Sequence, residues 1–225
     1  MSEIILGCDL SLTSPAVVAL RREGGEAAVE EVHCAASKVA DVGMFGRWRF
    51  VPEPKKLPAK TEEYRMQRLR YLASRMVFVF QKHRPSHVAI EDYATAMTGP
   101  SFYTIEFTGM VKLWLFQNRI PFRLYSPKSV KLFAAERGDA RKEEMRAAAL
   151  RRWGFDAEAF GKTARDDVAD ATAIAQLLHA ELSVRDGSLS INDVDESAQH
   201  VLTNETKANP INLLSRPFVL QHAEG

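Results

Sequence analysis

The stretch that most constrains the fold of this chain is an apolar segment near its start that ends in a carboxylate. Ile4–Leu6 is apolar, Gly7 permits the close approach of another backbone, and Asp9 precedes a turn rich in Ser, Thr and Pro. Ala16–Leu20 is apolar again, which predicts a β-hairpin with Asp9 at the end of its first strand. A carboxylate at a buried strand end is costly unless it is paired or holds a metal. The stretch alone leaves two roles open for Asp9, a turn cap and a metal ligand.

Two further stretches place acids in comparable positions. Glu91 ends an apolar segment, and Asp167 and Asp170 are three residues apart in a predicted helix, so they share one face. A right-handed strand–helix–strand connection would set the strand of Glu91 parallel to that of Asp9. Converging carboxylates repel one another unless a cation or a proton intervenes, and an all-oxygen site suits Mg²⁺ or Mn²⁺. The helical acids could instead only cap the helix; Asp166, at its expected start, would point away and complement the positive end of the helix dipole.

The order of the predicted elements is typical of an α/β protein. An antiparallel meander comes first and alternating strands and helices follow, which predicts a mixed five-stranded sheet with helices on both faces. The predicted strands are 4–9, 16–21, 27–35, 87–93 and 122–125. The predicted helices are 61–83 with Thr61 as cap, 102–119, one from Ser126-Pro127 to near Gly138, one from a capping Asp139 to Trp153 with Gly154 as terminator, and 166–182.

The composition of the chain suggests one folded body with additions. Residues 1–182 form the predicted body, and 46% hydrophobic content in 225 residues is enough for a full core. Ser37–Lys60 contains several Gly and Pro residues, carries Arg47-Trp48-Arg49, and is predicted to be an irregular insertion (the loop 37–60). Residues 183–225 are acidic and rich in turns, and they are predicted to form an extended or partly ordered tail.

The charges of the chain are unevenly distributed although the net charge is only +1. Arg47–Arg75 contains nine Lys or Arg against three Asp or Glu, and Arg119–Arg152 contains ten against four. From Glu181 onward there are three basic residues against seven acidic ones. Two basic blocks favour binding to a polyanion such as nucleic acid, although charge runs are also typical of solvated surfaces.

Other function classes find little support in the sequence. No apolar run approaches the ~20 residues of a membrane span, and no export signal is visible. Cys8 and Cys34 lack zinc-ligand spacing, which favours a reduced cytoplasmic setting. A Gly-rich phosphate loop and a nucleophile elbow are also absent from the sequence, so the acids carry the predicted chemistry.

At this point a family resemblance is clear. The strand-end Asp9, the strand-end Glu91 in AIEDY, and the pair Asp167 and Asp170 resemble the catalytic tetrad of RuvC Holliday junction resolvases, which have the ribonuclease H-like fold. Over Tyr125–Met145, YSPKSVKLFAAERGDARKEEM is similar to the family's two helices that meet at a Gly-containing turn. The chain departs from the family in three places. Leu10-Ser11 follows Asp9 where the family has Pro-Gly, a variant that resembles phage-encoded relatives, and the insertion and the tail have no counterpart in the bacterial enzymes.

The resemblance implies a metal-dependent endonuclease that cuts four-way (Holliday) or other branched DNA junctions by two-metal hydrolysis. The products would be a 5′-phosphate and a 3′-hydroxyl. Asp9, Glu91, Asp167 and Asp170 would hold two Mg²⁺ ions per active site, with Mn²⁺ able to substitute. Lys142 would act near the scissile phosphate. The enzyme would be a homodimer in the bacterial cytoplasm, encoded by a bacterium or by a phage, with helix 102–119 as a candidate dimer element. It would need no membrane and no small-molecule cofactor.

Several basic and aromatic residues are candidate DNA contacts. Lys131 is expected to lie a helix away from the acids, where it would mainly bind a phosphate. The insertion is expected to extend the DNA footprint, and an aromatic residue after Glu91 could wedge between unstacked bases. The full set of candidates is Lys128, Lys131, Arg141, Arg47, Arg49, Tyr93 and Phe102.

Three other functions remain open from the sequence. A related nuclease that acts on flaps or RNA–DNA hybrids would keep the same metal site. A non-catalytic junction-binding protein would keep the basic blocks but would not need four convergent acids. A sugar-kinase or actin-like ATPase shares the strand–turn–strand opening, but further Gly-rich phosphate turns would be expected in the sequence.

Overall fold

A mixed β-sheet forms the centre of the molecule. The computed structural model describes residues 2–35, 45–48, 61–92, 102–205 and 211–220. The sheet has the order β4-β3-β2-β1-β5-β6, in which β1, β2 and β3 are antiparallel neighbours and β5 and β6 add in parallel. The strands are β1 (Glu3–Asp9), β2 (Ala16–Glu23), β3 (Glu26–Ala35), β4 (Phe45–Trp48), β5 (His87–Glu91) and β6 (Phe122–Tyr125).

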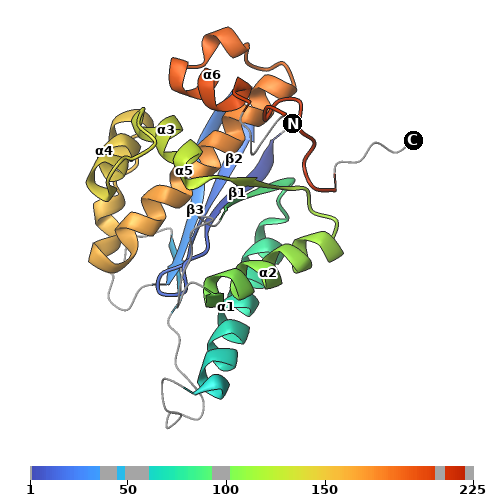
Figure 1. Ribbon diagram of the computed structural model, residues 1–225, viewed down its shortest axis with the longest axis vertical. Helices are drawn as coiled ribbons and strands as arrows, with labels where there is room; N and C mark the ends of the chain where they lie inside the picture. Colours follow the sequence, from blue (N-terminus) through green and yellow to red (C-terminus); the bar gives the residue numbers. More distant parts are fainter. Residues whose placement is uncertain (1, 36–44, 49–60, 93–101, 206–210, 221–225) are drawn as a thin grey trace.

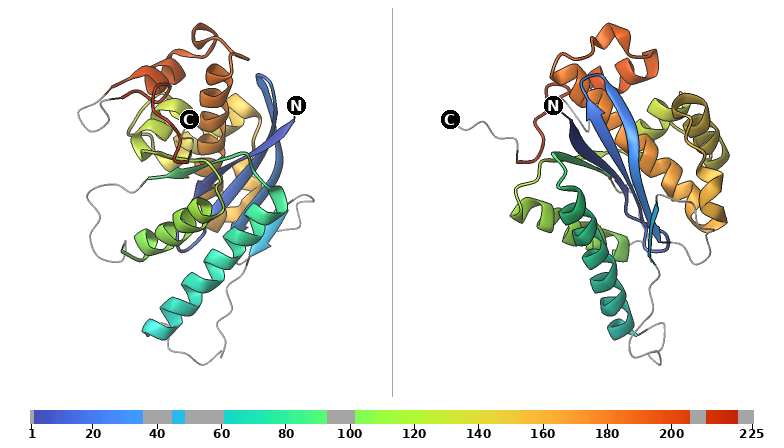
Figure 2. Two further views of the ribbon diagram at one scale, coloured as in Figure 1. Left: turned by 90° about the vertical axis from the view of Figure 1, so that its right-hand side faces the viewer. Right: turned by 180° about the vertical axis from the view of Figure 1, so that it is seen from behind.

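Helices cover both faces of this sheet, as expected for the α/β class (Figures 1 and 2). One face packs against α1 (Glu62–His83) and α2 (Phe102–Gln117). The other face packs against α3 (Pro127–Ala135), α4 (Lys142–Trp153) and α5 (Gly161–Arg185), with α6 (Glu196–Thr203) at one end. Short 3-10 turns at Ala157–Phe160 and Ile191–Asp193 complete the described elements.

The alternation of side chains along β1 separates the two cores. Ile5 packs on the side of α5, whereas Leu6 and Cys8 pack on the side of α1 and α2. All three side chains are fully buried. Because strand residues alternate between faces, Asp9 lies on the α5 side. Its partner in β2, Ala16, belongs to the same core as α5, which agrees with this placement.

Gly7 sets the distance between β1 and α5. A Cβ atom at this position would lie 2.3 Å from the backbone nitrogen of Ala175 and 2.5 Å from the carbonyl oxygen of Ala171. Such distances are far inside van der Waals contact, so the helix could not approach the strand if Gly7 carried a side chain. The close backbone approach predicted for Gly7 is therefore confirmed, and the small residues of α5 supply the other half of the contact.

Local capping signals fix several helix ends where the sequence predicts them. The side chain of Thr61 caps α1, and Ser126 caps α3 with Pro127 in its first turn. Gly154 ends α4 in a left-handed conformation (φ 63°). The prediction that Asp139 caps α4 is wrong. Asp139 pairs with Arg137, and α4 starts later because the side chain of Glu144 reaches back to the amide of Arg141 (2.7 Å).

The last long helix starts earlier than predicted. The sequence predicts its start at Asp166, but α5 begins at Gly161. Buried Phe160 and Ala164 anchor the additional turn against the core. Asp167 and Asp170 therefore lie inside the helix instead of in its first turn, and neither they nor Asp166 serve as caps.

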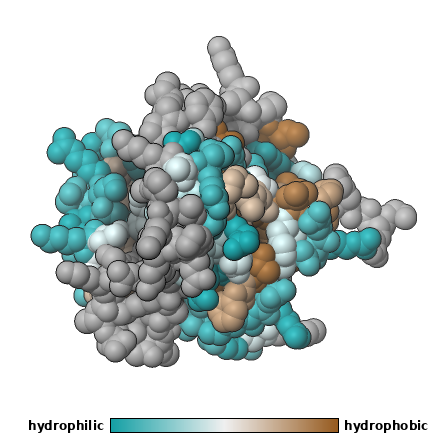
Figure 3. All heavy atoms as spheres, turned by 90° about the horizontal axis from the view of Figure 1, so that it is seen from below, coloured by the Kyte–Doolittle hydropathy of each residue, from teal (hydrophilic) through white to brown (hydrophobic). Residues whose placement is uncertain are grey.

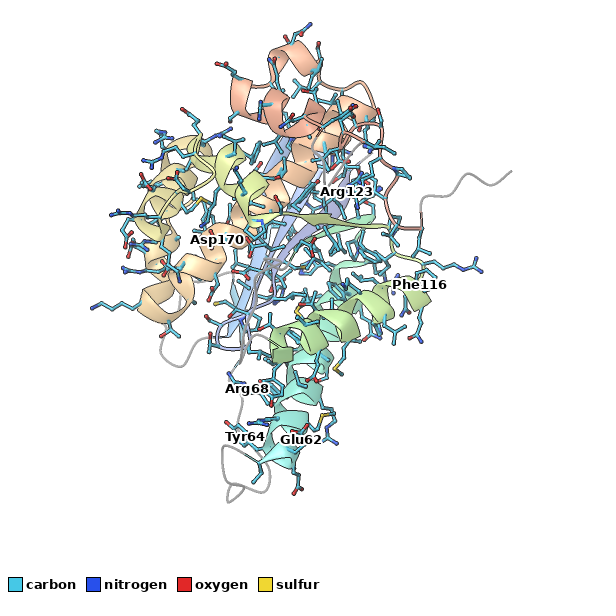
Figure 4. The ribbon with its side chains drawn as sticks, in the orientation of Figure 1. Glu62, Tyr64, Arg68, Phe116, Arg123 and Asp170 are labelled. Carbon is cyan, nitrogen blue, oxygen red and sulfur yellow. The ribbon has the colours of Figure 1, made fainter. Side chains whose placement is uncertain are left out.

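The segment after residue 183, predicted to be extended or partly ordered, packs against the body in the parts that are described. Ala198, Val201 and Leu202 of α6 are buried in the same core as α5. Residues 211–220 are attached through Arg123, labelled in Figure 4, which donates to the carbonyl oxygen of Arg216 (2.6 Å). Arg123 also donates to the fully buried carboxylate of Glu181 (2.5 Å). A buried ion pair thus connects β6, α5 and the C-terminal segment.

The insertion supplies one element that the sequence does not predict. The loop 37–60 is predicted to be irregular, but Phe45–Trp48 forms β4, which adds in parallel to β3 at the sheet edge. The remainder of the insertion lies outside the described residues. Among the helices that are described, none combines the length and the apolar character that a membrane-spanning segment requires.

Candidate active site

The sheet brings two of the four predicted acids side by side. β1 and β5 are parallel, and Cys8 pairs with Ile90 in their register. Asp9 and Glu91 each follow these residues, so both lie at the carboxyl ends of neighbouring strands. This is the arrangement predicted from the right-handed connection. Asp9 is 9% exposed and Glu91 is partly buried, so both carboxylates are largely withdrawn from water.

Helix α5 adds the other two acids from above the same strands. Asp167 and Asp170 are three residues apart and therefore share a face, and Gly7 lets this helix lie directly on β1. Figure 4 shows Asp170 on α5 beside the central strands. The negative charges of Glu91, Asp167 and Asp170 all act on Asp9, which places the four carboxylates in one cluster.

Burial and mutual repulsion raise the pKa values of this cluster. Burial is the larger cause, and together with the negative charge of Asp170 it raises the pKa of Glu91 to about 7. Burial and the charge of Asp167 likewise raise the pKa of Asp170 to about 7. Burial and the three other carboxylates raise the pKa of Asp9. Such a cluster is stabilised either by protons or by a cation.

Ser14 is a site residue that the sequence analysis does not single out. Its hydroxyl donates a hydrogen bond to a carboxylate oxygen of Asp167 and is 4% exposed. Burial raises the pKa of Asp167, while the hydrogen bond from Ser14 and the positive charge of Lys142 oppose the increase. The position of Ser14 in the polar turn after Asp9 indicates that it lies near the site. Its contact with Asp167 is not predictable, because the two residues are 153 positions apart in the sequence.

Asp166 is predicted to point away from the cluster, but its charge acts on Asp167 and Asp170, and it has a role of its own. Its carboxylate is bound by the guanidinium of Arg146 and lies 3.3 Å from the ammonium of Lys142. Burial alone would lower the pKa of Lys142, but the hydrogen bond to Asp166 and the nearby charges of Asp167 and Asp170 raise it. Asp166 therefore holds Lys142 beside the acids, and it is not the inert residue that the sequence suggests.

Lys131 lies closer to the acids than expected. The prediction places it a helix away, but its positive charge opposes the increase in pKa of both Glu91 and Asp170. Lys142 acts on Asp167 and Asp170. The prediction of a remote Lys131 is wrong. Helix α3 directly follows β6, the strand next to β5, so α3 begins close to the end of β5 where Glu91 lies.

The remaining candidate DNA contacts are described only in part. Lys128 and Arg141 are exposed near the start of α3 and at the start of α4, in the basic block of Arg119–Arg152. Arg47 lies in the edge strand β4, of which the backbone alone is described. Phe102 is the first residue of α2, and its side chain is not described; Arg49 and Tyr93 lie outside the described residues.

The donor set of the cluster fits hard divalent cations. Carboxylate oxygens are the ligands preferred by Mg²⁺ and Mn²⁺, and these four come from two strand ends and one helix. Burial and mutual repulsion raise their pKa values even though the positive charges of Lys131 and Lys142 oppose the increase. The arrangement can hold divalent ions next to two lysines, which is the chemistry of phosphodiester hydrolysis.

Known proteins resemble this chain over most of its described length. Residues 58–179 match the family model of crossover junction endodeoxyribonuclease RuvC. The RuvC of Brachyspira hyodysenteriae is 29% identical over 151 residues, which are 67% of this chain and 82% of that protein.

Two solved structures show the same fold. The T. thermophilus RuvC in complex with Holliday junction substrate has a TM-score of 0.55 at 22% identity, over 83% of this chain and 97% of that one. A further Thermus thermophilus RuvC structure has a TM-score of 0.51 at 24% identity, over 82% and 97% of the two chains. The expected ribonuclease H-like architecture is confirmed, with β4 as an additional edge strand.

Proposed function

The chain belongs to the family of crossover junction endodeoxyribonuclease RuvC, whose model spans more than half of it, and we propose that its own carboxylate cluster cuts four-way DNA junctions. The observation that carries this proposal is the convergence of Asp9, Glu91, Asp167 and Asp170 at the ends of β1, β5 and on α5. The family is one of metal-dependent nucleases. We propose Mg²⁺ as the ion, two per site with Mn²⁺ as a substitute, because all four donors are carboxylates.

Each residue of the cluster has a distinct proposed role. The charges of the other three acids all act on Asp9, and Asp9 would hold the ions together with Glu91, Asp167 and Asp170. The ions would supply Lewis-acid stabilisation and an activated water for cleavage to a 5′-phosphate and a 3′-hydroxyl. Ser14 would fix the orientation of Asp167, and Lys142, held by Asp166, would offset negative charge that develops at the phosphate.

The surface offers support for branched DNA and a second copy of the chain as partners. Lys128 and Arg141 are exposed and would contact phosphates of the DNA backbone. Met110, Leu113 and Phe116 of α2 are 39%, 57% and 54% exposed, which supports α2 as a dimer element. Figure 4 shows Phe116 on the outer side of α2, and Figure 3 shows hydrophobic patches between hydrophilic ones at the end where α1 begins.

Three further parts of the proposal rest on the sequence. Arg47, Arg49, Tyr93 and Phe102 are proposed to extend the DNA contact. Residues 1–182 are proposed as the nuclease domain and 183–225 as an extension. A cytoplasmic location, in a bacterial or phage-infected cell, would match the DNA substrate and the two buried free cysteines.

Cleavage of matched substrates tests the proposed function. Four-way, flap, RNA–DNA hybrid and linear duplex substrates are incubated with Mg²⁺ or Mn²⁺, and the cut positions are mapped. We expect paired cuts in the four-way junction. Preferential cutting of flaps or hybrids would instead identify the related nuclease, and junction binding without cutting would identify a binding module.

Single amide substitutions test the proposed site. Asp9→Asn removes a charge and a strong ligand but keeps the shape, so the cutting rate should fall at least about 100-fold, as is typical for the loss of one transition-state contact. Junction binding in Ca²⁺ should be at least as tight as in the parent, because less negative charge faces the phosphate. Glu91→Gln, Asp167→Asn and Asp170→Asn should behave alike.

Asp139→Asn is the matched control for these variants. Asp139 is exposed, and within the described part of the chain it forms an ion pair only with Arg137, so the Asp139→Asn variant should cut at the parental rate. Asp166→Asn is unsuitable as a control because it would release Lys142. Robust cutting by Asp9→Asn or Glu91→Gln would contradict the carboxylate site.

A further inference from the structure

A second group of metal-ligand side chains lies on the face of the sheet opposite the carboxylate cluster. Glu31 and His33 are on β3, and His83 is the last residue of α1. Their partners in β2, Ala19 and Val17, belong to the core shared with α1, whereas Asp9 faces α5. The two groups are therefore separated by the sheet, and nothing in the proposed cleavage reaction uses this second one.

The geometry of this group matches one face of a coordination tetrahedron. The Nε2 atoms of His33 and His83 are 3.0 Å apart, and the Oε2 atom of Glu31 lies 3.4 Å and 3.2 Å from them. In a tetrahedral zinc site with bonds of about 2.0–2.1 Å, neighbouring ligand atoms are about 3.3 Å apart. An ion could thus contact all three atoms without a change in the backbone.

The three donors are also held in place before any ion arrives. The side chains of His33 and His83 are 1% and 7% exposed, and that of Glu31 is 16% exposed. The rings of the two histidines meet edge to face, with centroids 5.2 Å apart. Burial lowers the pKa of His33 to about 4 and also lowers that of His83, so both imidazoles are neutral at pH 7, as metal ligands must be.

Two cationic side chains act on this group, because Lys82 pairs with Glu31 and the charge of Arg75 acts on His33. The ammonium of Lys82 lies 2.5 Å from the Oε2 atom of Glu31 and is itself 45% exposed. A divalent ion would displace this flexible, solvated ammonium, or share the carboxylate through its other oxygen. The competition weakens the site but does not block it, because neither imidazole nitrogen is bound by Lys82 in the described contacts.

We propose that Glu31, His33 and His83 form a binding site for a zinc-like transition-metal ion that is separate from the carboxylate cluster. Two imidazoles and one carboxylate favour Zn²⁺ over Mg²⁺, because Mg²⁺ prefers oxygen ligands. A water molecule would complete the tetrahedron. The ion would join the edge of the sheet at β3 to the end of α1, so its expected effect is on stability.

Zinc titration of the metal-stripped full-length chain tests this site. Titrations against a chromophoric chelator are made with the parent and with Asp9→Asn, which weakens the carboxylate cluster. Both proteins should bind zinc at the nitrogen-containing site, and in NMR spectra the ring signals of His33 and His83 should shift while those of His179 and His200 do not. Zinc should also raise the Tm of both proteins, because it binds only the folded state.

Glu31→Gln and Glu30→Gln form the matched pair of variants. Loss of a second-shell partner typically weakens metal binding 10–100-fold, so loss of a direct ligand in Glu31→Gln should weaken zinc binding by at least about tenfold. Glu30 is the partly exposed neighbour that pairs with Arg21 and is not one of the three donors, so Glu30→Gln should weaken zinc binding far less than Glu31→Gln. His83→Gln should lose the site as well, and Glu31→Gln keeps the test valid if this buried substitution fails to fold.

The outcomes separate this site from the proposed nuclease site. Equal zinc affinity in Glu31→Gln and Glu30→Gln, or unshifted signals of His33 and His83, would overturn the proposal and leave a hydrogen-bonded histidine pair. Neither result affects the nuclease assignment, which depends on cutting by the carboxylate variants. Conversely, an inactive parent that binds zinc through His33 and His83 would support this site and contradict the nuclease.

Discussion

At the scale of single residues, two lysines next to the carboxylate cluster differ in which acids they affect. Lys131 lowers the pKa of Glu91 and Asp170 from the raised values that burial produces. Lys142 is bound to Asp166 and is the more exposed contact, with 67% of its side chain in solvent. Lys131 therefore helps to keep these carboxylates ionised, whereas most of the Lys142 side chain lies in solvent.

The pH dependence of cutting should distinguish these lysines. In Lys131→Gln, the pKa values of Glu91 and Asp170 should rise further, so the acidic limb of the pH–rate profile should move to higher pH. One pKa unit would reduce the ionised fraction, and with it the rate at pH 6, up to about tenfold. Lys142→Gln should lower the rate across the whole range with a smaller displacement of the limb.

Lys162→Gln is the control for this comparison, since Lys162 is exposed in the first turn of α5. Its profile should coincide with that of the parent. Identical profiles for Lys131→Gln and the parent would show that Lys131 acts only on DNA binding, as the sequence suggests.

At the scale of elements, the contact between β1 and α5 positions the site. Gly7→Ala would insert a methyl group within 2.7 Å of three backbone atoms of α5, so the helix must move away. Overpacking of this kind costs about 1–3 kcal/mol, and a displacement of about 1 Å at a catalytic site can reduce the rate about 100-fold. We expect a lower Tm and a larger proportional loss of cutting, measured by thermal unfolding and single-turnover cleavage.

Gly109→Ala is the matched control on the opposite face of the sheet. A Cβ atom at Gly109 has no neighbour within 4 Å, and this residue lies inside α2. Because Ala favours helix more than Gly, the substitution should stabilise the protein by about 0.5–1 kcal/mol and should not displace α5. Parental cutting in Gly7→Ala would mean that α5 can shift without disturbing its acids.

At the scale of the whole molecule, the carboxylate cluster should make stability depend on both pH and metal. Glu91 and Asp170 have folded-state pKa values of about 7, above their ordinary values, so the folded state binds more protons than the unfolded state. Their contribution is present at low pH and is lost as the pH rises through about 7. In EDTA, the Tm should therefore fall between pH 6.5 and 8.5, and Mg²⁺ should reverse the fall.

This pH window separates the acids from the buried histidines. Burial lowers the pKa values of His33, His83 and His87, so the unfolded state binds protons more readily at these residues. Their contribution to stability is therefore lost as the pH falls below about 6.5, which is the opposite direction from the acids. Asp9→Asn should show a smaller fall in EDTA and a smaller effect of Mg²⁺. A Tm in EDTA that does not fall between pH 6.5 and 8.5 would contradict the raised pKa values of the cluster.

The buried ion pair of Glu181 should govern how firmly the C-terminal segment is attached. The Glu181 carboxylate accepts from Arg123 (2.5 Å), Arg185 (2.9 Å) and the hydroxyl of Tyr125 (2.6 Å). Glu181→Gln would leave Arg123, of which 2% is exposed, without its counter-ion, at a cost of about 3–5 kcal/mol. Urea unfolding measures this loss. Glu196→Gln, exposed on α6, should change stability by less than about 0.5 kcal/mol.

The sequence by itself determined the features that depend on neighbouring residues. Thr61, Ser126 and Gly154 set helix ends because a cap acts within one turn. The positions of Asp9 and Glu91 at the ends of adjacent parallel strands follow from apolar segments and from the handedness of the connection. The membership of Asp9, Glu91, Asp167 and Asp170 in one site is therefore predictable, because strand ends and helix faces have fixed periods.

Only the tertiary structure decided which partners these residues meet. Ser14 donates a hydrogen bond to Asp167, and Arg146 and Lys142 bind Asp166. Helix α5 begins at Gly161 because Phe160 and Ala164 pack into the hydrophobic core. The edge strand β4, the packed segment after residue 183 and the cluster of Glu31 with two histidines arise in the same way. These contacts join residues far apart in the chain, so no local period or cap in the sequence encodes them, and only the packing of the whole molecule brings them together.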